Sequence, residues 1–410
     1  MHWEPAIAET ALEVFKDGRH LGQFRRGASG PVSFAYDRDY EGPPISLSLP
    51  LDGGATRNAA ERFLDNLLPD NVRVRGRWAR QLGTTEEPFE LLAHMGEDLA
   101  GALVLNPEGQ APDSGSAGAV IATDDQIADR IASIIHDPDA WLAAEQVGST
   151  RLSLAGAQGK FTLARIGDDW FWPSAAVPST HILKPAMQRL EQVPEAEAGA
   201  LTLAIELGLD APVANAVKIR GQSTFIVERF DRDTAQSVAR RIHTEDFAQA
   251  VGRSPDQKYG MSPEQIIEVL GRHAAESEKY RFIRLLAFNV YLGNADAHAK
   301  NYSVFLDDEI RLTPLYDAAP TLVWPTLTDD RLAMKVGGAL RSSEVQFAHW
   351  RKLANRTDLD EDTVVGIAEE IGRGIRDRSS AVFEGAGMSA EMLHRLESVV
   401  RSTTRHLPRG

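Results

Sequence analysis

The chain of 410 residues contains no cysteine. This absence excludes a disulfide framework, an iron–sulfur cluster, a thiolate zinc site and a cysteine nucleophile. Long apolar runs are also missing, because no stretch approaches the ~20 residues that a membrane-spanning helix needs. Basic residues are outnumbered, with 44 Lys and Arg against 59 Asp and Glu and a net charge of −15. This charge argues against broad nonspecific binding to nucleic acid, although it is compatible with a local basic patch.

What is present is typical of a folded globular protein. Apolar residues make up 43% of the chain and charged residues 25%, which excludes wholesale disorder. The length predicts about two domains. Residues 1–9 hold Glu4, Pro5 and Glu9 and lack a basic segment followed by an apolar core. We therefore expect no signal peptide and a cytoplasmic location.

Hydrophobic patterning predicts a mixture of strands and helices up to about residue 229 and mostly helices after it. Alternation predicts a hairpin over residues 12–24 with a turn at Asp17-Gly18, and a further strand over 45–49. Two strands joined by Gly221-Gln222 are predicted over 216–220 and 224–229. Helical spacing predicts helices over residues 59–68, 125–135, 197–207, 263–273, 278–292, 361–375 and 390–403. This order predicts an α+β protein with two lobes.

Two segments in the middle of the chain suggest phosphate chemistry. Residues 153–160 place small residues and two glycines between predicted strands, so backbone N–H groups could approach an anion closely. They match neither G-x-G-x-x-G nor the Walker pattern, and an ordinary hairpin turn is the alternative. Lys184 follows an apolar strand and could put a point charge on a phosphate. An edge-strand lysine with its ammonium in solvent is the other interpretation.

Two acidic positions follow an apolar helix later in the chain. Asp296 and Asn301 have the D-x-x-x-x-N spacing with which protein kinases place a base and a metal ligand on one loop. Asp317 comes one hairpin later, where kinases carry a second metal-binding aspartate, but without the Phe-Gly that usually follows it. A polar loop and a turn acid are the alternatives. The order of all four features is that of a kinase, while the fingerprints of hydride transfer and of serine hydrolases are absent.

The sequence resembles the HipA family, the serine/threonine kinase toxins of bacterial type II toxin–antitoxin modules. Seven ordered blocks carry this resemblance, at residues 63–70, 153–160, 180–184, 227–232, 245–249, 293–301 and 312–317. It implies a two-lobed protein-kinase-like fold with a mixed N-terminal subdomain over 1–105, a linker or long loop over 106–124, a nucleotide-binding lobe over 125–235 and a helical catalytic lobe over 236–410.

The resemblance also implies the roles of individual residues. Asp296 would be the catalytic base, Asn301 and Asp317 the Mg²⁺ ligands, and Lys184, with Glu197 as a partner, the phosphate-binding lysine. Gln249 would support the site, and Ser153 would be an autophosphorylated serine whose modification switches the kinase off. The remaining ATP-binding positions would be the flap Ala155, Gly156, Ala157, Gln158, Gly159 and Lys160, the hinge Glu228, Arg229 and Phe230, and His298, Ala299, Lys300 and Tyr316.

The implied activity is ATP- and Mg²⁺-dependent phosphorylation of an aminoacyl-tRNA synthetase, the glutamyl enzyme above all, which would arrest growth or cause persistence. A helix-turn-helix antitoxin resembling HipB would neutralise the toxin and supply the contacts to operator DNA, and no membrane would be involved. Two alternatives stay open: a small-molecule phosphotransferase, and a corepressor scaffold without activity. The presence of Lys184, Asp296, Asn301 and Asp317 counts against the scaffold.

Overall fold

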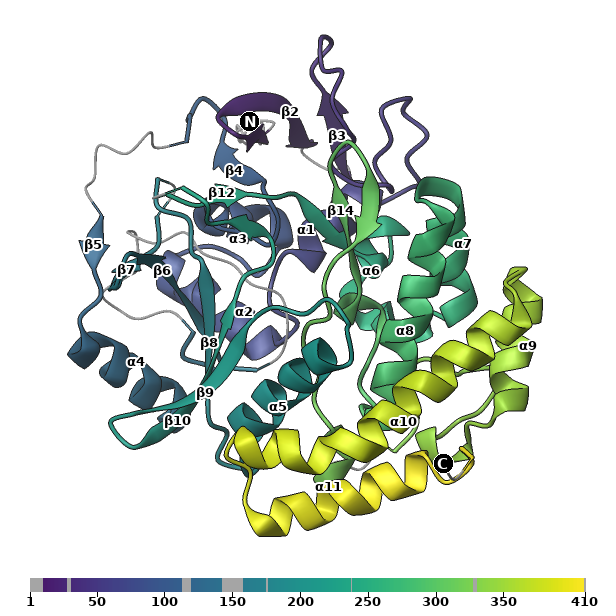
Figure 1. Ribbon diagram of the computed structural model, residues 1–410. Coiled ribbons are helices and arrows are strands. Elements are labelled where there is room, and N and C mark those ends of the chain that lie inside the picture. The colour runs from purple at the N-terminus through teal and green to yellow at the C-terminus, as the bar shows by residue number, and fades with distance from the viewer. Residues whose placement is uncertain are drawn as a thin grey trace, which may run out of the picture. The chain divides into compact units, whose positions relative to one another are not determined.

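The computed structural model describes residues 10–27, 31–112, 119–141, 158–174, 176–236, 238–326 and 330–408. The chain divides into two compact units (Figure 1). The first comprises Met1–Ile182, Asp231–Asp256 and Leu306–Asp308, and the second comprises Leu183–Phe230, Gln257–Phe305 and Glu309–Gly410. Both units contain strands and helices, which confirms the predicted α+β class.

The first unit begins with an antiparallel sheet in the order β3-β2-β1-β4. Its strands are β1 (Thr10–Lys16), β2 (Arg19–Arg26), β3 (Val32–Tyr36) and β4 (Val104–Pro107). The predicted hairpin is confirmed: Asp17 and Gly18 both have positive φ, 51° and 75°. Two such residues form the type I′ turn whose twist matches that of the flanking strands.

Helices α1 (Ala59–Asn66), α2 (Val72–Leu82) and α3 (Pro88–Met95) contribute to one core with this sheet. The side chain of Phe24 on β2 stacks on that of Phe63 on α1, with 5.9 Å between ring centroids. Burial of such large apolar side chains is the main source of stability for this part of the chain. The core also includes Leu12, Val14, Leu64, Trp78, Leu91 and Leu92.

The strand predicted over residues 45–49 is wrong, because this segment forms a turn. The backbone N–H of Leu49 donates to the carbonyl of Ser46 over 3.0 Å, and the hydroxyl groups of Ser46 and Ser48 lie 2.8 Å apart. The Tyr36 hydroxyl accepts from the Ile45 N–H and donates to the Leu49 carbonyl. Serine side chains that bond the local backbone favour turns over sheet pairing.

The rest of the first unit contains short strands and two more helices. In α4 (Asp124–His136), Thr123 and Gln126 form a capping box, which satisfies the first N–H groups of the helix. Strand β7 pairs antiparallel with β5 and with β6. The elements are β5 (Val120–Ile121), β6 (Phe161–Ile166), β7 (Asp169–Trp172), β11 (Arg232–Asp233), β12 (Arg240–Arg241), β13 (Thr244–Asp246) and α6 (Phe247–Ala250).

The second unit begins within β8 (His181–Pro185) and continues with α5 (Val193–Glu206). Strands β9 (Ala214–Ile219) and β10 (Gln222–Glu228) pair antiparallel. The turn between them is Arg220-Gly221, one residue earlier than predicted, because these are the two residues with positive φ, 47° and 81°. The elements that follow are α7 (Pro263–His273), α8 (Glu276–Leu292), β14 (Ser303–Leu306), β15 (Ile310–Leu312), α9 (Phe347–Thr357), α10 (Glu361–Gly385) and α11 (Ala390–Thr403).

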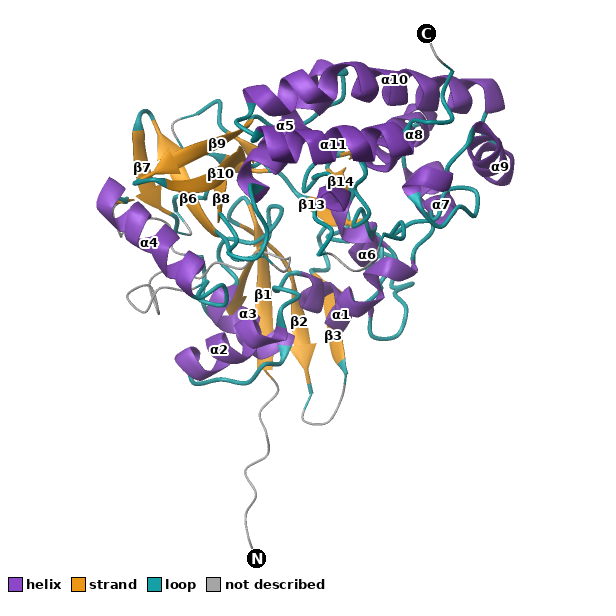
Figure 2. Ribbon diagram, turned by 90° about the horizontal axis from the view of Figure 1, so that it is seen from below, coloured by secondary structure: helices purple, strands orange, loops and turns teal. Residues whose placement is uncertain are grey.

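Helix α10 contacts α5, α8, α9 and α11 (Figure 2). It continues to Gly385, well beyond the predicted end at residue 375. Two of its glycines permit close helix packing: a Cβ on Gly374 would lie 2.4 Å from a methyl group of Leu207, and one on Gly372 would lie 3.1 Å from the Tyr291 ring. Tertiary contacts therefore extend α10 through a polar stretch that the hydrophobic pattern left out.

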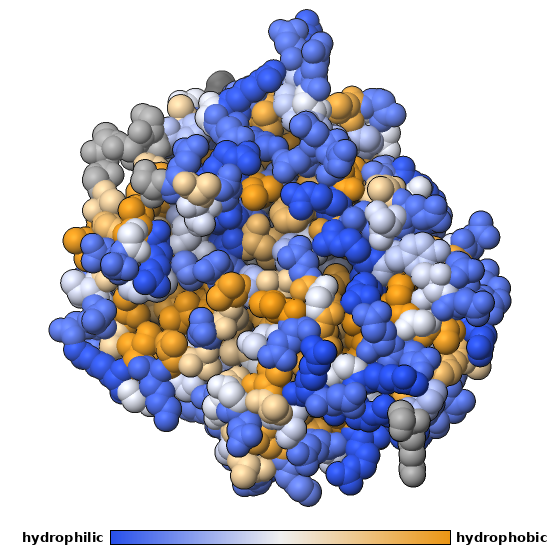
Figure 3. Space-filling view, viewed as in Figure 1, coloured by the Kyte–Doolittle hydropathy of each residue, from blue (hydrophilic) through white to orange (hydrophobic). Residues whose placement is uncertain are grey.

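Hydrophilic residues cover much of the face shown in Figure 3. The large apolar side chains that are fully buried include Trp78, Trp350, Tyr291 and Phe288. Among the helices that the structure describes, none is long and apolar enough to cross a membrane.

Candidate active site

Lys184 lies at the centre of a cluster of charged groups in the second unit. Its ammonium donates to Oε2 of Glu197 over 2.7 Å and to Oδ1 of Asp317 over 2.6 Å. Strand β8 carries the lysine and helix α5 carries the glutamate. The side chains of Lys184 and Glu197 are buried, whereas that of Asp317 is 51% exposed. Asp317 is thus the member of the cluster that an incoming ligand can reach.

The electrostatics of this cluster keep Lys184 charged. Burial by itself lowers the pKa of the Lys184 ammonium, but the adjacent carboxylates of Asp317 and Glu197 outweigh this effect and the net pKa is raised. A buried ammonium paired with two carboxylates stays protonated at neutral pH. Lys184 therefore presents a permanent positive charge beside the partly exposed carboxylate.

Asp317 also contacts the loop that carries the predicted base. The Asn301 side-chain amide donates to Oδ2 of Asp317 over 3.0 Å, and its oxygen accepts from the backbone N–H of His298 over 3.1 Å. Asp317 has a φ of 53°, a left-handed conformation in which a non-glycine residue is uncommon. Such backbone conformations are enriched at functional sites.

The donor set of Asn301 and Asp317 fits Mg²⁺. A carboxylate and an amide side chain stand next to each other, and oxygen atoms are the ligands that this ion prefers. Within the described residues there is no group of three or more His, Cys, Asp or Glu that could hold a metal ion. Magnesium sites of phosphoryl-transfer enzymes typically use one or two carboxylates and take further oxygens from substrate phosphates and water.

Asp296 lies in the loop that follows α8. Gly293 ends the helix with a φ of 80°, and the Asn294 side chain bonds both the Asn289 side chain and the N–H of Asp296. The hydroxyl of Tyr259 donates to Oδ1 of Asp296 over 2.8 Å. These contacts set where the carboxylate lies, and they show that it can accept a hydrogen bond from a hydroxyl group.

Residues of the predicted hinge and of the loop after α8 meet at Tyr316. Its hydroxyl donates to the Lys300 carbonyl over 2.7 Å and accepts from the Ser303 hydroxyl. Its ring packs on Phe230, with 5.1 Å between centroids. Glu228 ends β10 and is exposed, whereas Arg229, Lys300 and Ala299 are buried.

The other predicted site residues fall into two groups. Ser153, Ala155, Gly156 and Ala157 lie outside the described residues. The structure places Gln158, Gly159, Lys160 and Gln249 in the first unit.

The described part of the predicted flap contacts α4 and the residues that follow this helix. A Cβ on Gly159 would lie 2.7 Å from a methyl group of Ile134, so the glycine permits close packing there. The ammonium of Lys160 lies 5.4 Å from the centroid of the Trp141 ring. Gln249 caps α6 together with Asp246.

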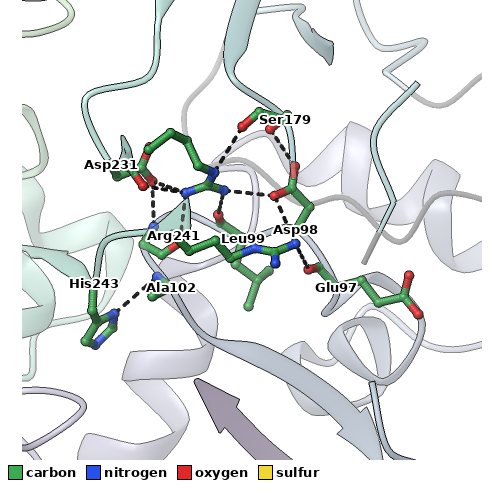
Figure 4. Close-up of polar contacts among 10 residues, drawn as sticks. Glu97, Asp98, Leu99, Ala102, Ser179, Asp231, Arg241 and His243 are labelled. Atoms are coloured by element: carbon green, nitrogen blue, oxygen red, sulfur yellow. Dashed lines mark hydrogen bonds and ion pairs between the residues drawn. The ribbon is translucent and has the colours of Figure 1, made fainter. Parts of the chain in front are cut away.

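Sequence reasoning missed a buried charge cluster in the first unit (Figure 4). The Arg232 side chain is 0% exposed, and it pairs with Asp98 at 2.8 Å and with Asp231 at 3.0 Å. Its guanidinium also donates to the carbonyls of Ser179, Gly101 and Leu99. Three separate chain segments are thereby joined through one side chain. The only signal in the sequence is an Asp-Arg pair that follows Phe230.

The neighbours of Asp98 extend this cluster. The Ser179 hydroxyl donates to Oδ2 of Asp98 over 2.5 Å, and Arg241 donates to the carbonyl of Glu97. His243 lies between the carbonyl of Ile45, 2.8 Å away, and the N–H of Ala102. Charges buried this deeply are retained only with partners of this kind.

The geometry of the second unit defines a class of protein. A strand lysine paired with a helix glutamate, and a D-x-x-x-x-N loop bonded to a second aspartate, form the constellation that protein kinases use to hold and transfer a phosphoryl group.

Comparisons with known proteins specify the family within this class. The model of the HipA-like C-terminal domain matches residues 152–378, and that of the HipA N-terminal domain matches residues 12–106. The chain therefore belongs to the HipA family.

Individual relatives cover most of the chain. The protein Y4mE of Sinorhizobium fredii is 34% identical over 92% of this chain and 94% of its own length. The serine/threonine-protein kinase toxin HipA of Shewanella oneidensis is 29% identical over 74% of this chain and 73% of its own length. The fold is that of a solved structure, the complex of HipA, HipB and operator DNA from Shewanella oneidensis MR-1. That match has a TM-score of 0.82 and 24% identity and covers 96% of this chain and 97% of that one.

Proposed function

We propose that this chain is an ATP- and Mg²⁺-dependent serine/threonine protein kinase that acts as the toxin of a toxin–antitoxin pair. The observation that carries this proposal is the bonded series Glu197–Lys184–Asp317–Asn301. Membership in the HipA family, in which the Shewanella oneidensis relative is a kinase toxin, supports it.

In the proposed reaction each residue of the cluster has a role in positioning or charge. Lys184 holds the ATP phosphates, and Glu197 orients its ammonium. Asn301 and Asp317 would hold Mg²⁺, which when bound neutralises charge on those phosphates. Asp296 orients the acceptor hydroxyl and takes its proton. The acceptor oxygen bonds to the γ-phosphorus as the bond to ADP breaks, and ADP leaves.

The remaining assignments concern the nucleotide. The hinge residues Glu228, Arg229 and Phe230 would lie beside the adenine, and His298 and Lys300 near the phosphates. The segment 155–160 would cover the phosphates, and Gln249 would support the site. The packing of Phe230 on Tyr316 supports the hinge assignment, because it links the end of β10 to the residue before Asp317.

The proposed target is an aminoacyl-tRNA synthetase, above all the glutamyl enzyme, whose modification would stop tRNA charging and lead to growth arrest or persistence. The proposed partner is a HipB-like antitoxin. The related structure that contains HipA, HipB and operator DNA supports this partner. Because this chain carries a net charge of −15, we assign most DNA contacts to the antitoxin. A cytoplasmic location follows from the proposed target.

The test of the proposed function is the variant Asp296→Asn, which removes the base and keeps the size of the side chain. We expect ATP affinity to persist while phosphoryl transfer falls by about 10²–10⁴-fold. Radiolabelled ATP is offered with lysate proteins and, separately, with small alcohols. The matched control is Asp308→Asn, an exposed carboxylate outside the site. Undiminished transfer in Asp296→Asn contradicts the proposed function, and label only on small alcohols identifies a small-molecule phosphotransferase.

A further inference from the structure

Tyr259 presents its hydroxyl to the proposed catalytic base. Its oxygen lies 2.8 Å from Oδ1 of Asp296, and both residues belong to the second unit. The Tyr259 side chain comes from the short 3₁₀ helix Pro255–Gly260. Its ring meets that of His298 edge to face, with 5.1 Å between centroids. The contact therefore joins an exposed aromatic side chain to the loop that carries the base.

The geometry of this contact is that of an acceptor hydroxyl on a general base. A base must lie about 2.6–3.2 Å from the oxygen whose proton it takes. The Tyr259 hydroxyl meets this requirement and donates its proton to the carboxylate. A serine, a threonine or a water molecule could not bond the same carboxylate oxygen along the same direction while Tyr259 occupies it.

We propose that Tyr259 determines the specificity of the acceptor subsite: its hydroxyl occupies Oδ1 of Asp296, competes with water for that oxygen, and yields to a protein hydroxyl. This inference rests on the proposed function, which assigns Asp296 as the base. A hydrogen bond to a carboxylate is charge-assisted and stronger than one between neutral groups. Water would have to break this bond unaided, whereas a protein acceptor brings further contacts that offset the loss.

The position of Tyr259 on the chain allows this exchange. The residue is 54% exposed, so a displaced hydroxyl can bond to solvent instead. It stands next to Gly260 at the end of a 3₁₀ helix of six residues, and a short terminal segment of this kind shifts locally at low cost. By contrast, Asp296 is bonded through Asn294 to the end of α8. The tyrosine is therefore the member of the pair that moves.

The test is the initial rate of ADP release by the full chain with ATP and Mg²⁺ and no acceptor protein. All variants are compared in the Ser153→Ala background, so that transfer to Ser153 does not contribute to the ADP released. In this reaction a water oxygen bonds to the γ-phosphorus, the bond to ADP breaks, and the proton of water passes to Asp296. Tyr259→Phe keeps the ring that contacts His298 and removes only the hydroxyl. We expect its rate of ADP release to rise about tenfold, which corresponds to about 1.4 kcal/mol.

Two further variants show whether a faster release of ADP depends on Asp296. In Tyr259→Phe/Asp296→Asn the rise should disappear, because it depends on the freed base. Tyr280→Phe, which removes a hydroxyl that contacts the start of α10, is the matched control and should not change the rate. An unchanged or slower rate in Tyr259→Phe overturns the inference, and so does a rise that survives in the double variant. Activity that persists in Asp296→Asn alone overturns the proposed function instead.

Discussion

The ammonium of Lys184 donates to Oδ1 of Asp317 over 2.6 Å across a separation of 133 residues in the chain. The other oxygen of the same carboxylate accepts from the amide of Asn301. One aspartate thus connects the strand lysine with the loop that follows α8. Lys184 and Asn301 contact different oxygens of Asp317. Substitution of Lys184 can therefore test the proposed phosphate binding, and substitution of Asn301 the proposed metal binding, separately.

Replacement of the lysine tests the phosphate-binding half. We expect Lys184→Met to reduce phosphoryl transfer by about 10²–10³-fold, the loss typical when one electrostatic contact to the transition state is removed. The matched control is Lys218→Met, because Lys218 is exposed on β9. Steady-state kinetics with ATP measure both variants. Equal rates for Lys184→Met and the wild type would show that the ammonium has no part in transfer.

Replacement of the asparagine tests the metal-binding half. In Asn301→Ala we expect the Mg²⁺ concentration for half-maximal activity to rise about 10–100-fold, with part of the rate recovered at high Mg²⁺. A titration of activity against Mg²⁺ at fixed ATP measures this shift, and Asn215→Ala on β9 serves as the control. An unchanged Mg²⁺ requirement together with a lower rate would remove Asn301 from the proposed ligands.

The histidine beside the buried charge cluster predicts a pH dependence of stability. Burial is the main cause that lowers the pKa of His243 to about 4, against an ordinary value near 6.5. Below pH 6.5 the unfolded chain binds this proton and the folded chain does not, so stability falls as the pH drops from 6.5 to 4. The full loss is about 3 kcal/mol.

Comparison of the wild type with His243→Gln isolates this effect. Denaturant unfolding at pH 6.5 and 4.5 gives the free energy of unfolding for both proteins. Burial also raises the pKa of Glu245 to about 8, which acts in the opposite direction, but Glu245 is present in both proteins and its contribution cancels. A stability difference between the two proteins that does not change with pH would contradict the prediction.

The Arg232 cluster predicts a large stability effect from one substitution. Arg232→Met would remove the guanidinium that pairs with the buried carboxylates of Asp98 and Asp231, and breaking a buried ion pair typically costs about 3–5 kcal/mol. Arg240→Met is the matched control, because Arg240 is exposed and lies 3.8 Å from Asp233. We expect the control to change stability by less than about 0.5 kcal/mol. Similar midpoints of urea unfolding for Arg232→Met and Arg240→Met would contradict the predicted contribution of Arg232 to stability.

Ser153 provides a prediction about regulation. A phosphoserine adds about −1.5 to −2 charges at pH 7, which would repel the ATP phosphates if residues 155–160 cover them. We expect purified protein incubated with Mg²⁺ and ATP to become phosphorylated at Ser153 and to lose activity. Mass spectrometry maps the site in the wild type, Ser153→Ala and Asp296→Asn, and only the first should carry it. Phosphorylated protein that keeps full activity would contradict this role.

Local patterns in the sequence determined many of the elements. The Asp17-Gly18 hairpin, α7 and α11 were predictable because period and capping residues lie within a few positions of each other: Ser262 caps α7 and Ser389 caps α11. The α+β class and the HipA family were predictable for a related reason, since each is recognised by the order of elements and motifs along the chain. Helix α2 was not predicted, because arginines alternate with apolar residues over its first turns and Gly76 lies in its interior.

Only the tertiary structure decided features that depend on distant partners. Residues 45–49 alternate like a strand, yet the Tyr36 hydroxyl bonds both ends of the segment and holds it as a turn. Likewise, nothing near Tyr259 in the sequence indicates that its hydroxyl contacts Asp296, 37 residues later. Burial of Arg232 between two aspartates is a third case. In each case the conformation depends on a polar contact between residues that are distant in the sequence. The pattern of apolar residues along the chain does not indicate such a contact.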